Sequence, residues 1–209
     1  MHINPITLPA ALAEGRRLTA RDHRIIVLLA EHRVLTAVQV TRAVGFPNPT
    51  RARHRLLALS QRGVLARFRD CRRPGSAPWH YTLGVGGAAV HAAATGAPLP
   101  RRGEVVERVM RLHHSRDLDH RLGVNDFFTR LLAHAHDHPE SYRLDTWWPE
   151  ATISAACAGI VRPDGYGEWT DTTGAPPVTV GFFLEHDTGT EPHRRLLDKI
   201  DKYGELPPR

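Results

Sequence analysis

An uncharged stretch near the end of the chain, Val178 to Leu184, places the strongest limit on the fold that this sequence can adopt. It reads Val-Thr-Val-Gly-Phe-Phe-Leu, and a short apolar run of this length is typical of a buried β-strand. Two acids, Glu185 and Asp187, follow at once. Residues two apart on an extended chain point to the same face. The sequence therefore predicts two carboxylates side by side at the end of a core strand.

Further acids surround the same predicted strands. Asp164 lies in an upstream turn, and Glu150 follows an aromatic strand. Carboxylates gathered at a sheet end repel one another unless a cation or a proton joins them, and Mg²⁺ or Mn²⁺ is a suitable cation for oxygen ligands. We therefore predict a metal site at Asp164, Glu185 and Asp187, and a catalytic set of Glu150, Asp164, Glu185 and Lys199. A strand that simply ends in a polar turn is the alternative.

The charge of the chain is divided unevenly between its halves. The net charge is +6, but residues 1–111 carry +12 and residues 112–209 carry −6. A basic half suits a polyanion, because its side chains neutralise phosphates and release counterions. The acidic half needs a different role. We expect two parts with different functions.

Residues 18–83 predict three helices followed by a β-hairpin. The helices are expected at 20–32, 36–44 and 50–62, and the two strands at 64–69 and 79–83. This is the element order of a winged helix-turn-helix, whose third helix enters the major groove of DNA. We predict contacts to double-stranded DNA from the third helix and the hairpin tip, through Arg51, Arg53, His54, Arg55, Arg72 and Arg73. The alternative is the same module used for protein contacts only.

The rest of the chain predicts helices and then strands. Helices are expected at 84–96, 104–114 and 117–137, strands at 143–149, 151–161 and 178–184, a polar hairpin loop at 165–177, and a last helix at 192–203. Tyr142 and Tyr203 are candidate nucleophiles for nicking DNA, although a core or interface role fits either residue better.

The order of acids resembles the core of the PD-(D/E)xK nucleases. Pro163-Asp164 and Glu185 match its motif, but Asp187 stands where that family has lysine. Lys199 could substitute from a different backbone position. The resemblance implies a mixed α/β restriction-endonuclease-like domain at the end of the chain. With the winged helix-turn-helix expected from the element order and the helices that follow it, the whole chain is expected to have an α+β fold. A degenerate scaffold that binds DNA or a partner without cutting is the alternative.

The corresponding boundaries are a flexible leader at 1–17, the winged helix-turn-helix at 18–97, a linker with bridging helices at 98–138, and the nuclease-like domain at 139–209. Nuclease-like domains usually add a strand after the last helix, so an incomplete domain is among the expectations.

Residues 18–203 as a whole resemble the replication-relaxation family, actinobacterial proteins found largely on plasmids and mobile elements. The resemblance is carried mainly by Leu118-Asp-His-Arg-Leu-Gly-Val-Asn, Arg162-Pro-Asp-Gly, Phe183-Leu-Glu-His-Asp-Thr-Gly-Thr-Glu and Lys199-Ile-Asp-Lys-Tyr. It implies a DNA-binding role in plasmid replication, relaxation or transfer. The partners that follow are double-stranded DNA and other replication or transfer proteins. A homodimer is a further expectation, which belongs to the alternative of a transcriptional regulator.

Two functions are therefore compatible with the sequence. One is a mobile-element replication or relaxation protein that is also a candidate metal-dependent nickase or endonuclease. The other is a winged-helix transcriptional regulator with a non-catalytic assembly domain. The sequence has no signal-peptide core and no apolar run long enough to span a membrane, so we expect a cytoplasmic protein without a membrane partner.

Overall fold

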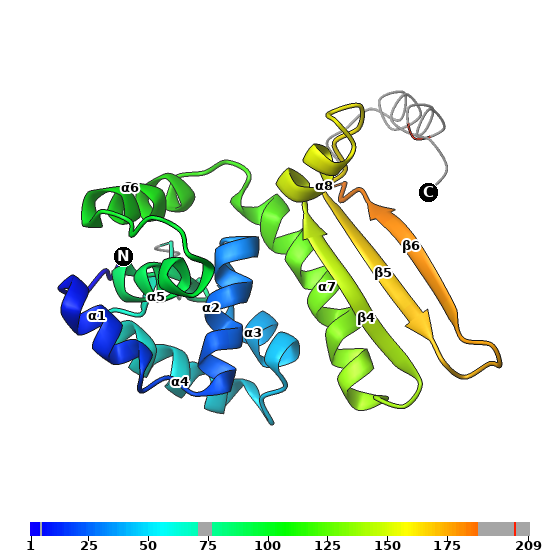
Figure 1. The fold of residues 1–209 in the computed structure, drawn as a ribbon, viewed down its shortest axis with the longest axis horizontal. Helices are drawn as coiled ribbons and strands as arrows, with labels where there is room; N and C mark the ends of the chain where they lie inside the picture. The colour runs from blue at the N-terminus through cyan, green and yellow to red at the C-terminus, as the bar shows by residue number, and fades with distance from the viewer. Residues whose placement is uncertain (5, 71–76, 188–202, 204–209) are drawn as a thin grey trace. The chain divides into compact units, whose positions relative to one another are not determined.

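The computed structural model describes residues 1–4, 6–70, 77–187 and 203. Helices and two three-stranded antiparallel sheets make up an α+β fold, as the sequence predicts (Figure 1). The chain divides into two compact units, Met1–Asn125 and Asp126–Arg209. No helix within the described ranges is both long enough and apolar enough to cross a membrane.

The first unit holds most of the helices and the smaller sheet. Its helices begin and end close to the predicted positions, because the expected caps form. Thr19 and Thr36 each make a capping box, Asn48 accepts a hydrogen bond from the backbone N–H of Arg51, and Gly45 ends its helix with a φ of 67°. The elements are α1 (Leu8–Gly15), α2 (Ala20–His32), β1 (Leu35–Thr36), α3 (Ala37–Val44), α4 (Pro49–Gln61), β2 (Leu65–Phe68), β3 (His80–Leu83), α5 (Val85–Thr95) and α6 (Arg102–His113).

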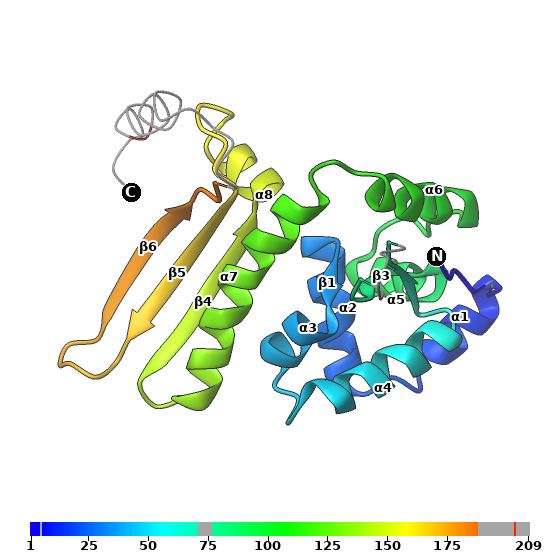
Figure 2. The same ribbon diagram turned by 180° about the vertical axis from the view of Figure 1, so that it is seen from behind.

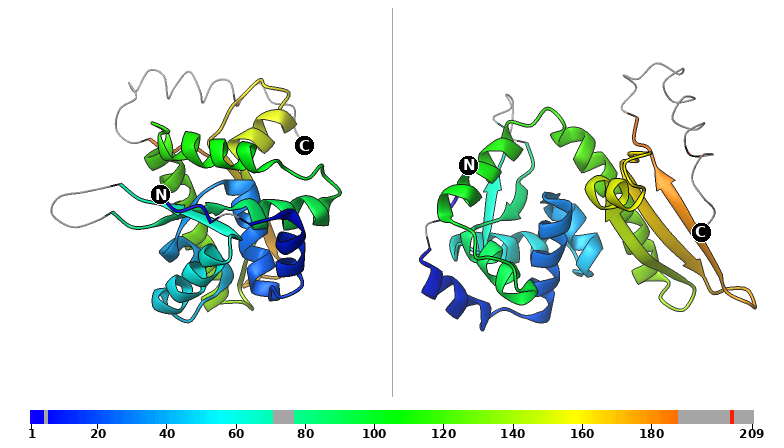
Figure 3. Two further views of the ribbon diagram at one scale, coloured as in Figure 1. Left: turned by 90° about the vertical axis from the view of Figure 1, so that its left-hand side faces the viewer. Right: turned by 45° about the horizontal axis from the view of Figure 1, so that its top comes forward.

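The sheet of the first unit has the order β1-β3-β2, and all its pairs are antiparallel. Figure 2 labels two of its strands, β1 and β3. Leu35 pairs with Tyr81, and Leu65 pairs with Leu83. Strands β2 and β3 are consecutive in the chain and form the predicted hairpin (Figure 3). Its tip, residues 71–76, lies outside the described part of the chain.

The first residues differ from the predicted flexible leader. His2 forms an antiparallel bridge with Arg67, and the side-chain amide of Asn4 donates to the Gln61 carbonyl at 2.7 Å. Helix α1 follows, with Ala11 fully buried. The segment is ordered because it supplies a bridge partner to β2 and an apolar contact to the unit. The sequence did not predict the bridge or helix α1, because this stretch has no clear helical period.

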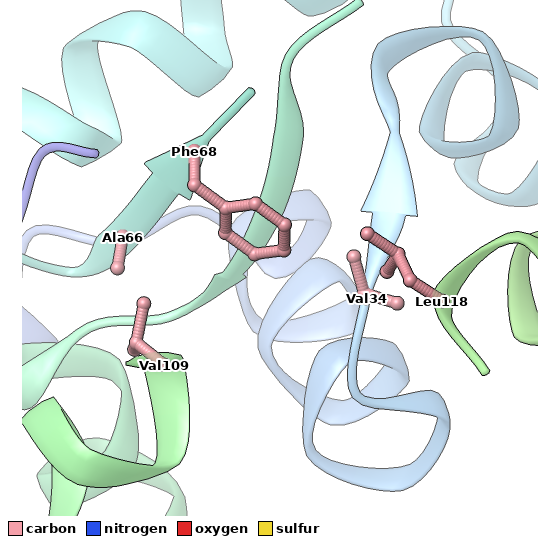
Figure 4. Close-up of a cluster of buried hydrophobic side chains, with 5 residues drawn as sticks. All are labelled: Val34, Ala66, Phe68, Val109 and Leu118. Atoms are coloured by element: carbon pink, nitrogen blue, oxygen red, sulfur yellow. The ribbon is translucent and has the colours of Figure 1, made fainter. Parts of the chain in front are cut away.

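Apolar residues from four parts of the first unit meet in one cluster (Figure 4). Val34 precedes β1, Ala66 and Phe68 lie on β2, Val109 lies on α6, and Leu118 begins α7 (Leu118–Asp137). Each of them is less than 7% exposed. The cluster holds α6 and the start of α7 against the hairpin.

The first half of α7 is also tied to the first unit by polar side chains. Asn125 donates to the Val34 carbonyl at 2.8 Å, and Gln39 on α3 donates to the Leu122 carbonyl at 2.8 Å. Both donors are buried. The Leu118-Asp-His-Arg-Leu-Gly-Val-Asn stretch therefore has a structural role here, since its two ends anchor the helix.

The second unit begins with the other half of α7 and contains β4 (Tyr142–Pro149), α8 (Glu150–Ala156), β5 (Gly165–Asp171) and β6 (Val178–Leu184). The strands form an antiparallel sheet in the order β4-β5-β6. Phe128 of α7 stacks on Trp147 of β4 and Phe182 of β6, with ring centroids 5.2 and 5.9 Å apart. Gly165 and Gly167 make room for Phe128, because a Cβ atom at either position would lie within 3 Å of its ring.

Three predictions for the second unit are wrong. Residues 151–161 do not form a strand, because α8 begins at Glu150 directly after β4. The predicted loop at 165–177 contains β5, the central strand of the sheet. Strand β6 is present as expected but is mostly exposed rather than buried, since it is an edge strand among the strands of the described residues. The predicted last helix at 192–203 lies outside the described residues, apart from Tyr203.

Candidate functional site

Helix α4 presents basic side chains to solvent along one side. Ala52, Leu56 and Leu59 are fully buried, which turns the remaining positions of the helix outward. Arg51 and Arg53 are both exposed, and the neighbouring His54 is exposed as well. The Nε of Arg53 donates to the Pro49 carbonyl at 3.3 Å, which holds the start of this side chain along the helix. These three residues are available to an outside anion.

Arg55, the fourth residue predicted to contact DNA from this helix, is placed differently. Its guanidinium forms a bidentate ion pair with Asp22 of α2, and the Nε to Oδ1 distance is 2.8 Å. The Asp22 side chain is 1% exposed. Burial opposes the ionisation of Asp22, but hydrogen bonds from Arg55 and Thr19 outweigh it, so the pKa of Asp22 is lowered. Arg55 therefore fastens α4 to α2, and Asp22 is the partner that the sequence did not reveal.

The hairpin carries a second basic surface that was not anticipated. The guanidinium groups of Arg67 and Arg69 lie over the Trp79 ring, at 4.2 and 4.4 Å from its centroid. Cation–π contacts of this kind hold a guanidinium in place without neutralising its charge. The signal in the sequence was the spacing of two in Arg67-Phe-Arg69, which puts both side chains on one face of an extended chain at the end of β2. The predicted contacts Arg72 and Arg73 lie outside the described residues.

The register of the second sheet brings three of the predicted acids to one end. Pro149 pairs with Gly165, and Gly165 pairs with Leu184. Glu150, Asp164 and Glu185 each adjoin one of these residues in the chain. They therefore lie at the same end of β4, β5 and β6, with Asp164 at the central strand.

Two of these acids accept hydrogen bonds from the chain. Asp164 accepts the backbone N–H of His186 at 2.7 Å through Oδ2, and Glu185 accepts the hydroxyl of Tyr203 through Oε1. The Tyr203 ring stacks on Phe183 at 4.9 Å. Burial raises the pKa of Tyr203, and the hydrogen bond and negative charge of Glu185 raise it further. This phenol therefore stays protonated and acts as a donor to the carboxylate.

The described residues do not supply the predicted metal site. No group of three or more His, Cys, Asp or Glu side chains among them could hold an ion. Glu150 and Asp187 are exposed, and Lys199 lies outside the described part of the chain. Asp164 and Glu185 each already accept a protein donor through one of their two carboxylate oxygens.

One family model matches the chain. Its description is replication-relaxation, and the match covers residues 26–207, which include α4, the hairpin and the acidic sheet end. No curated protein and no solved structure matches the chain.

Proposed function

Since this chain belongs to the replication-relaxation family, we propose that it binds double-stranded DNA in the replication or relaxation of a plasmid or mobile element. The observation that carries this proposal is the exposed basic side of α4, with Arg51, Arg53 and His54. Exposed basic side chains on one helix are suited to phosphate groups and to base edges in the major groove.

The element order of the first unit supports a winged helix-turn-helix as the DNA-binding module. Helices α2, α3 and α4 are followed by the β2–β3 hairpin, and the short strand β1 pairs with β3. In such a module α4 is the recognition helix and the hairpin is the wing. Arg67 and Arg69, held over Trp79, then contact the DNA backbone beside the groove.

Binding of a fluorescent duplex, measured by anisotropy, tests this function. The double variant Arg51→Ala/Arg53→Ala removes two exposed charges from α4. We expect it to bind about tenfold more weakly or worse, because both residues contact phosphate or base. The matched control is Arg130→Ala/Arg143→Ala, which removes two exposed arginines from the second unit, each paired with a nearby aspartate. Equal affinities for the two double variants would contradict the proposal.

A second candidate function, divalent-metal-dependent nicking, is favoured by the common position of Glu150, Asp164 and Glu185 at one sheet end. Supercoiled plasmid incubated with the protein and Mg²⁺ or Mn²⁺ tests it. Nicking that is lost in both Asp164→Asn and Glu185→Gln supports a catalytic second unit. A plasmid that stays supercoiled with either ion supports a non-catalytic assembly unit, as in a winged-helix regulator.

A further inference from the structure

Strand β6 carries exposed apolar side chains on both faces of the second sheet's edge. The side chains of Val178, Val180 and Phe183 are 56%, 54% and 38% exposed. Strand β6 pairs with β5 on one side, and no strand in the described ranges pairs with its other side. Its seven residues contain no charge and no proline. An edge of this kind is a template for a further strand.

The opposite edge of the same sheet is protected. Strand β4 carries Arg143 and Asp145, which form an ion pair with each other. Its register with β5 also shifts between Leu144 and Thr146. Charges and irregular register are the common means by which proteins prevent strands from adding to a sheet edge. Strand β6 has neither, so the two edges of this sheet differ in their suitability for pairing.

We propose that β6 pairs antiparallel with β6 of a second copy of this chain, around a two-fold axis at Gly181. The two three-stranded sheets then form one sheet of six strands. A two-fold contact requires a surface that complements itself, and the sequence of β6 meets this requirement. Val178 lies opposite Leu184 of the second copy, Val180 lies opposite its Phe182, and Gly181 lies opposite Gly181.

The same pairing covers the exposed valines. Phe182 stacks on Phe128, so it faces α7, and Val178 and Val180 share that face because they are four and two residues away. On pairing, each valine gains an apolar cross-strand neighbour from the second copy. Phe127, which is 38% exposed and lies 5.9 Å from the Phe182 ring, extends the apolar surface onto α7.

The absence of charge on β6 selects the partner. A foreign charged peptide finds no complementary group on this strand, whereas an identical strand matches it in length, polarity and side-chain order. The resulting dimer carries two copies of the DNA-binding unit. Its formation does not depend on DNA, so the proposal can fail without affecting the proposed function.

Sedimentation velocity of the full chain without DNA tests the dimer. The wild type is expected to sediment as a dimer of about 47 kDa, twice the chain mass of 23.3 kDa, at micromolar concentration. Val180→Lys should raise the dissociation constant about tenfold or more, because a charge on the edge opposes strand addition. The control is Val27→Lys, which places the same charge at a 51% exposed valine on α2 and should leave the dimer unchanged.

A mixed disulfide tests the register directly. Both native cysteines are first replaced, as Cys71→Ser and Cys157→Ser. One sample then carries Val178→Cys and the other Leu184→Cys, and circular dichroism confirms that each is folded. Oxidation of the mixture should give a covalent dimer, whereas either sample alone should stay monomeric on a non-reducing gel. A wild type that is monomeric at about 100 μM, a Val180→Lys variant that dimerises like Val27→Lys, or a mixture that does not crosslink would overturn the proposal.

Discussion

The ion pair between Arg55 and Asp22 can be tested by its effect on stability. The sequence predicts that Arg55 contacts DNA, whereas in the structure Arg55 of α4 pairs with Asp22 of α2. The Asp22 side chain is 1% exposed and accepts hydrogen bonds from Arg55 and from the N–H and hydroxyl of Thr19, each at 2.8 Å. Removing one partner of a buried ion pair costs about 3–5 kcal/mol. Since the Arg55 side chain is 32% exposed, water reduces this cost, and we expect Arg55→Ala to lower the free energy of unfolding by about 2–3 kcal/mol.

The effect should depend on pH in a defined direction. The folded-state pKa of Asp22 is lowered, because its hydrogen bonds outweigh the opposing effect of burial. The pair therefore contributes its full stability above the unfolded-state pKa of about 3.9 and loses it as the pH falls through the folded-state pKa. The stability difference between wild type and Arg55→Ala should be largest near neutral pH and should shrink below about pH 4.

Urea unfolding at pH 7 and at pH 3.5 measures both features. Arg51→Ala is the matched control, since it removes an exposed arginine from the same helix and should change stability by less than about 0.5 kcal/mol. Asp22→Asn, alone and combined with Arg55→Ala, completes a double-mutant cycle for the pair. If Arg55→Ala costs no more stability than Arg51→Ala at pH 7, or if its cost is the same at both pH values, Arg55 does not fasten α4 to α2 through Asp22.

Other substitutions test the packing and the buried groups. Gly167→Ala should cost about 1–3 kcal/mol of stability, because the added Cβ would lie 2.5 Å from the Phe182 ring. The control is Gly103→Ala, which adds a Cβ on the open surface of a helix and should be neutral or stabilising. Chemical denaturation measures both. Phe128→Ala should cost about 3–5 kcal/mol in the same assay, and a loss below about 1 kcal/mol would show that the aromatic stack is not central. Burial lowers the pKa of His32 to about 3 in the folded state. As the pH falls, this imidazole is therefore protonated in the unfolded state before it is protonated in the folded state. Stability should therefore fall by about 2 kcal/mol from pH 7 to pH 5, and His32→Gln should remove most of that slope; an unchanged slope would argue against a neutral buried histidine.

The first unit could be predicted well from local signals in the sequence. Thr19, Thr36 and Asn48 precede apolar residues at helical spacing, and each caps the helix that the pattern indicates. The strands after Gly63 follow from the change of period. The role of Arg55 could not be predicted in the same way, because its partner Asp22 is 33 positions away and becomes a neighbour only when α2 and α4 pack together.

The second unit was harder to predict because its strands depend on tertiary contacts. Gly165-Tyr-Gly-Glu-Trp-Thr-Asp has the glycine and polar content of a loop, but the glycines are required by the Phe128 and Phe182 rings that lie against them. Residues 150–156 are short enough to be read as strand or helix. The apolar run of β6 indicated a strand correctly, but composition alone cannot distinguish a central strand from an edge strand that a partner could cover.

If α4 binds DNA through its exposed charges, the affinity must depend on salt concentration, and it must depend on it less when those charges are removed. The association constant of the wild type and of Arg51→Ala/Arg53→Ala for one duplex is measured between 50 and 200 mM salt, a range over which such contacts weaken strongly. A plot of log K against log[salt] should have a slope shallower by about 2 for the double variant, since each lost phosphate contact removes about 0.9. Identical slopes for the two proteins would contradict the claim.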